Sequence, residues 1–90
     1  MLATIICSHR GRQSIHQIEA PTVKDCLIAW AGRVDLDGLA DEGRTRLRGE
    51  MADFADPPIA GFGNVWRLSV ASPTEGGDEL GLVVVETVRP

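Results

Sequence analysis

The sequence predicts an α+β fold in a single domain of 90 residues, with the element order ββααββ. Two observations support this prediction. Apolar residues recur at helical spacing in the middle of the chain, and short runs rich in β-branched residues lie towards both ends. We expect four strands in one mostly antiparallel sheet, with two helices packed on one face of it. The chain is too short to fill two separate hydrophobic cores.

One apolar stripe defines the first helix, over residues 23–34. Its members recur at i, i+3, i+4, i+7, i+8 and i+11 and are Val23, Cys26, Leu27, Trp30, Ala31 and Val34. Thr22 comes immediately before the stripe, so its hydroxyl can accept a hydrogen bond from the backbone N–H of Asp25. The sequence therefore predicts a capped helix with one buried face.

A second helix is expected from about Gly38 to Phe54. Asp35 and Asp37 precede it and offer capping carboxylates. The residues expected on its buried side are Leu36, Ala40, Gly43, Leu47, Met51 and Phe54. Glycines within the segment lower its helical propensity by about 1 kcal/mol each relative to alanine.

Four runs are expected to be strands, with a polar turn after the first: residues 2–8, 13–20, 65–72 and 80–88. The first and last runs are apolar on both sides, which predicts that they lie in the middle of the sheet. Ile15 and Ile18 fall on opposite faces, which predicts either a bulge or a strand covered on both sides. Helices on one face leave Val83, Val85 and Ile5 under-covered on the other, which predicts a homodimer through that face.

The charge balance is acidic, with a net charge of −4. This balance disfavours non-specific binding to nucleic acid or to an anionic membrane. The longest apolar run, residues 82–85, is far too short for a membrane span, and the first residues lack the pattern of a signal peptide. We therefore expect a cytoplasmic protein that has no membrane partner.

Cys7, His9 and His16 form the one cluster with catalytic potential. A nucleophilic cysteine needs a histidine within hydrogen-bonding reach, and Cys7 and His9 share a face of the first strand. The simpler interpretation is that Cys7 and Cys26 are free, buried thiols and that the histidines are solvated. The spacings fit no metal site, so no metal or cofactor is predicted.

Charged residues suggest two kinds of binding surface. Acidic side chains of the second helix could contact a basic protein: Asp41, Glu42, Glu50 and Asp53. Arginines could instead form a phosphate-binding surface for RNA or DNA: Arg10, Arg12, Arg44, Arg46 and Arg48. The absence of tyrosine and the small number of aromatic residues argue against stacking on nucleobases.

The chain resembles a family of small, uncharacterised bacterial α+β proteins. The resemblance covers about a third of the chain and is carried by residues that build the fold: Gly11, Ile15, Gln17, Ala20-Pro21-Thr22, Trp30-Ala31 and Asn64-Val65-Trp66. It implies a bacterial, cytoplasmic setting. It implies no activity, cofactor or functional residue.

From these observations the sequence predicts a small non-enzymatic protein-interaction module, such as an immunity protein or an antitoxin that neutralises a basic partner. Two alternatives remain open. One is a nucleic-acid-binding module that uses the arginines, and the other is a small enzyme that uses Cys7 with His9 or His16.

Overall fold

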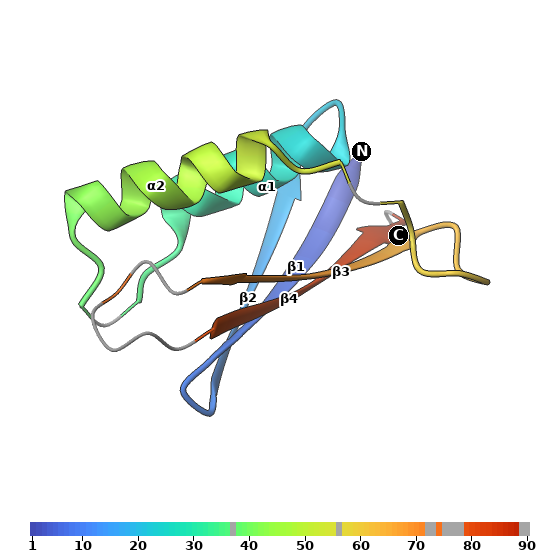
Figure 1. Ribbon diagram of the computed structural model, residues 1–90. Helices are drawn as coiled ribbons and strands as arrows, with labels where there is room; N and C mark the ends of the chain where they lie inside the picture. The colour runs from blue at the N-terminus through green and yellow to red at the C-terminus, as the bar shows by residue number, and fades with distance from the viewer. Residues whose placement is uncertain (37, 56, 72–73, 75–78, 89–90) are drawn as a thin grey trace.

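The chain folds into one four-stranded antiparallel sheet with two helices on a single face (Figure 1). The computed structural model describes residues 1–36, 38–55, 57–71, 74 and 79–88. In chain order the elements are β1 (Leu2–His9), β2 (Arg12–Glu19), α1 (Val23–Arg33), α2 (Asp41–Ala52), β3 (Val65–Ala71) and β4 (Glu79–Thr87). The predicted fold class and element order are confirmed.

The strand order β2-β1-β4-β3 places β1 and β4 in the middle of the sheet, as predicted. Both strands bury most of one face under the helices, where Ile5 and its partner Val84 have no exposed surface. Val83 and Val85 lie on the opposite face and are only half-buried. The placement of Ile5 on the uncovered face was wrong: strand alternation puts it on the helix side together with Ala3 and Cys7.

A two-residue turn connects β1 to β2. Arg10 and Gly11 both have positive φ, 52° and 76°, which is the conformation of a type I′ hairpin turn. The strands then pair without interruption from His9↔Arg12 to Leu2↔Glu19. No bulge separates Ile15 from Ile18, and the strand is not covered on both sides. Ile18 is buried beneath α1, whereas Ile15 points to the other face and is 64% exposed.

The helix α1 follows its prediction closely. Thr22 is the N-cap, and its hydroxyl accepts a hydrogen bond of 3.1 Å from the backbone N–H of Asp25. The buried residues of the helix are Cys26, Leu27, Trp30 and Ala31. Val34 follows as the C-cap, also fully buried, and donates its backbone N–H to the Trp30 carbonyl.

The helix α2 is shorter than expected. A turn closed by a hydrogen bond from the Leu39 N–H to the Leu36 carbonyl comes first, and Gly38 within it has positive φ. The helix therefore begins only after Ala40, which is the N-cap and has no side-chain cap, so Asp35 does not cap the helix. Asp37 lies outside the described residues. Of the buried side predicted for this helix, Gly43, Leu47 and Met51 are buried. Leu36 and Phe54 are half-buried, and the placement of Ala40 on this side was wrong, because Ala40 is exposed.

The second pair of strands completes the core. Trp66, Leu68 and Val70 point towards the helices, as predicted, and pack beside Leu80, Leu82 and Val84 of β4. The last predicted residue of β3, Ser72, lies outside the described residues. Neither of the two helices has the length and apolar character of a membrane span within the described part of the chain.

Candidate functional site

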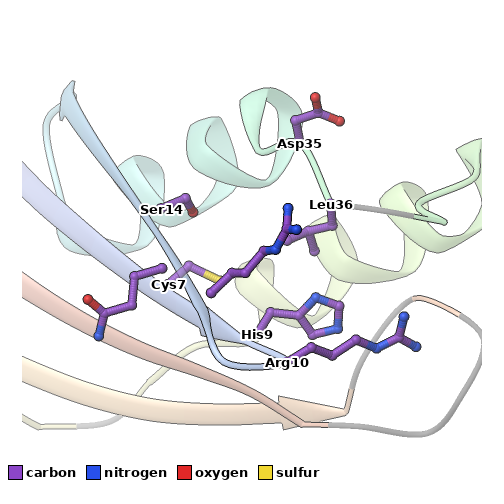
Figure 2. A pocket seen from close by; sticks show the side chains of 8 residues that line it. Cys7, His9, Arg10, Ser14, Asp35 and Leu36 are labelled. Carbon is purple, nitrogen blue, oxygen red and sulfur yellow. The ribbon is translucent and has the colours of Figure 1, made fainter.

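A pocket of about 310 Å³ lies where the β1–β2 hairpin meets the chain that leaves α1 (Figure 2). Its lining residues are Cys7, His9, Arg10, Arg12, Gln13, Ser14, Asp35 and Leu36. The hairpin supplies most of them, and the segment after α1 supplies the last two. The sheet is therefore one wall of the pocket and the exit from α1 is another.

Strand register explains why these side chains meet. Cys7 is paired with Ser14, and His9 is paired with Arg12. Paired residues of antiparallel strands point to the same face, and alternate residues of each strand share that face. The four side chains therefore form a two-by-two polar group on the inner face of the sheet, next to the turn.

The Cys7 thiol is unsuited to nucleophilic attack in this position. Cys7 is 1% exposed. Burial raises the pKa of its thiol, and the neighbouring Ser14 hydroxyl lowers the pKa by a smaller amount. A reactive cysteine needs the opposite shift, because the thiolate is the nucleophile. Cys7 and Cys26 are both free and buried, as predicted.

The two histidines occupy different places. His9 is 7% exposed and lies beside Cys7 in the pocket, so the prediction that these two residues share a face is confirmed. The expectation of a solvated His9 was wrong. His16 is paired with Ile5, one step further along the sheet, and does not line the pocket. Its Nδ1 atom is buried and has no hydrogen-bond partner in the described part of the chain. The predicted group of Cys7 with both histidines is thus only partly assembled.

The five arginines do not line one surface. Arg10 and Arg12 line the pocket. Arg44 donates from Nη1 to the Ala31 carbonyl at 2.9 Å, and so caps the last turn of α1. Arg46 and Arg48 are exposed on α2 and are not part of the pocket lining.

The acidic residues proposed for partner binding all lie on or next to α2, but they do not form one patch. At 3.6 residues per turn, Glu42, Glu50 and Asp53 surround the position of Arg46. Asp41 falls on a different part of the exposed arc. Positive and negative charges are therefore mixed over the helix surface, and a basic partner would meet both.

Sequence reasoning missed Arg12 and Ser14 as neighbours of Cys7 and His9. A two-residue turn over Arg10-Gly11 would have revealed them, because it fixes the register of the hairpin. Asp35 and Leu36 had no such signal, since their position depends on how α1 packs on the sheet.

Among the residues that the structure describes, no group of three or more histidine, cysteine or acidic side chains is placed to hold a metal ion. No protein-family model matches the chain. Curated proteins and solved structures give no significant match either.

Proposed function

We propose that this chain is a non-enzymatic protein-interaction module that pairs with a second copy of itself through β2. The observation that carries this proposal is the free edge of the sheet. β2 is an outer strand of eight residues, and nothing in the described part of the chain pairs with its outer side. At its centre Ile15 is 64% exposed. Two such edges could join into one eight-stranded sheet.

The backbone of β2 is arranged for such pairing. The type I′ turn makes His9 and Arg12 a hydrogen-bonded pair, so the alternating pattern directs the backbone groups of Gln13, Ile15 and Gln17 away from β1. Edge strands are commonly protected by proline, lysine or a bulge. β2 contains none of these, and its charged residues, Arg12 and Glu19, lie at its two ends.

The side chains suggest one register. Antiparallel pairing centred on Ile15 places this residue opposite its own copy, and places Gln13 opposite the partner's Gln17. About six backbone hydrogen bonds would form across the new junction. Ile15 already continues a row with Ile6 and Val83 on the uncovered face, because these residues are aligned across three strands. The junction would join this apolar row to the equivalent row of the second copy.

The edge is a better contact than the uncovered face itself. On that face Thr4 and Thr87 are hydrogen-bonded at 2.6 Å, and Gln17 donates to Thr4 at 3.2 Å. These satisfied polar groups would have to be desolvated in a face-to-face dimer. Antiparallel sheets commonly leave one such face to solvent. A contact through Val83 and Val85 is therefore the alternative outcome of the tests.

Light scattering during size-exclusion chromatography tests the proposal. The wild-type chain should be dimeric at tens of micromolar. Ile15→Glu should be monomeric, because the register places the two carboxylates directly opposite each other, where like charges are destabilising. Ala71→Glu is the matched control: it adds the same charge at an exposed position of the other edge strand and should stay dimeric.

Circular dichroism should show that both variants remain folded, since both positions are exposed. A wild-type chain that is monomeric at about 100 µM would contradict the proposal, as would an Ile15→Glu variant that stays dimeric.

A further inference from the structure

We propose that the pocket at the hairpin binds a small oxyanion, such as the carboxylate or phosphoryl group of a small molecule. The proposal concerns the inner face of the sheet and does not depend on pairing through the outer side of β2. Hydrogen-bond donors dominate the lining: two guanidinium groups, an imidazole, a hydroxyl and an amide.

Arg12 is the principal donor. Its backbone is held by the pairing with His9 at the end of the hairpin. Within the described residues its guanidinium forms neither a hydrogen bond nor an ion pair, although Asp35 lines the same pocket. A guanidinium presents a rigid fork of donors that matches the oxygens of a carboxylate or phosphate. An unpaired fork in a concave site is therefore suited to an oxyanion.

Ser14 provides the second donor. It lies two residues from Arg12 on the same face of β2, so the two side chains are neighbours along the strand. Its Oγ atom is buried, and its polar neighbour is the Cys7 thiol, a weak hydrogen-bonding group; no nitrogen or oxygen atom of the described residues satisfies the hydroxyl. An unsatisfied buried hydroxyl costs free energy, typically about 1–3 kcal/mol. Rotation of the side chain about χ1 would turn this hydroxyl towards the pocket, where a bound oxyanion would accept its hydrogen bond and remove the cost.

The rest of the pocket is compatible with this ligand. His9 and Arg10 line the pocket at the turn, where each already has an interaction partner, and Figure 2 shows both side chains at the same end of the site. Asp35 is the one carboxylate among the described residues of the lining, and in Figure 2 it is directed away from His9 and Arg10. A volume of about 310 Å³ is at the small end of ligand pockets, which selects for a small molecule.

Titration of the ¹⁵N-labelled chain, followed by the backbone amide resonances, tests the inference. The probes are inorganic phosphate and succinate at constant ionic strength, with chloride as the reference anion. At least one of the two probes should cause saturable shifts confined to residues 7–14 and 35–36, with a Kd on the order of 1 mM. The difference between the two titrations shows which oxyanion geometry the site prefers.

Two variants and one control make the test specific. Arg12→Gln should weaken binding about tenfold, because a charge-assisted hydrogen bond is lost. Ser14→Ala should weaken it several-fold. Arg46→Gln removes the same charge from the exposed surface of α2 and should leave the affinity unchanged. Ile15→Glu should also bind the probe, which separates this inference from the proposed dimer.

Two results would overturn the inference. One is the lack of any saturable shift with either probe at concentrations up to about 50 times the expected Kd. The other is an equal loss of affinity in Arg12→Gln and Arg46→Gln, which would indicate general charge attraction instead of a site.

Discussion

Cys7 lies on the inner face of β1 and Cys26 on the inner face of α1, each with at most 1% of its surface exposed. The Cys26 thiol is 3.6 Å from the Ile18 carbonyl, to which it donates a weak hydrogen bond. Burial raises the pKa of both thiols. Both side chains therefore act as small apolar residues of the core at neutral pH.

This shift has a consequence for stability at alkaline pH. The folded thiols keep their protons to higher pH than the unfolded ones. Their contribution to the free energy of unfolding is therefore fully present below about pH 8.5 and is lost as the pH rises towards the folded pKa values. We expect the free energy of unfolding to fall above that pH, by at most about 1.4 kcal/mol per pH unit for each thiol. The chain has no tyrosine to titrate in this range.

Urea unfolding at pH 7.5 and 9.5 measures the effect. A variant with both Cys7→Ala and Cys26→Ala should lose much less stability between the two pH values than the wild-type chain does. An equal loss in both proteins would assign the pH dependence to other groups.

The two helices differ at their N-termini. In α1 the Thr22 side chain satisfies the N–H of Asp25, whereas Ala40 at the same position of α2 has no side-chain acceptor. Ala40 nevertheless has the extended backbone of an N-cap residue, with φ −90° and ψ 167°. Residue 40 therefore has the backbone conformation of an N-cap residue, but its alanine side chain cannot accept a hydrogen bond.

Substitutions at these two positions should change stability in opposite directions. Thr22→Ala should lower the free energy of unfolding by about 1 kcal/mol, because an N–H loses its acceptor. Ala40→Ser should raise it by about 0.5–1 kcal/mol by adding one. Thr22→Ser serves as the control and should be nearly neutral. Urea unfolding measures all three, and a destabilised Ala40→Ser would refute the N-cap assignment of residue 40.

The same contrast explains what the sequence could predict about each helix. The stripe of α1 is continuous and has a capping threonine, so its bounds followed from local chemistry. The acids before α2 looked like caps, but the turn over Leu36–Leu39 and the positive φ of Gly38 delay the helix. That turn forms where the chain crosses between two packed helices, and no local pattern specifies it.

At the scale of the whole molecule, apolar content on two sides was enough to place β1 and β4 in the middle of the sheet. Alternation was also enough to place Cys7 and His9 together. The register of β1 with β2 depends on a turn of two residues with positive φ. One of them is Arg10, which is an unusual residue for that conformation. The exposed edge at Ile15 could not be predicted, because exposure of an edge depends on what the rest of the chain leaves uncovered.

In the proposed dimer two copies pair through β2, with Ile15 on the two-fold axis. In this register the two Ile15 Cα atoms would be about 5.5 Å apart, within the range that a disulfide spans. The two copies of Gln17 would be about 14 Å apart and could not be linked. Gln13 and the partner's Gln17 would again be close.

Disulfide cross-linking under mild oxidation measures this geometry most directly. Ile15→Cys should form a covalent dimer. Gln13→Cys and Gln17→Cys should each stay monomeric alone and should cross-link when mixed, while the buried Cys7 and Cys26 stay reduced. Efficient cross-linking of Val85→Cys, with none at position 15, would contradict pairing through β2 and place the contact on the uncovered face of the sheet.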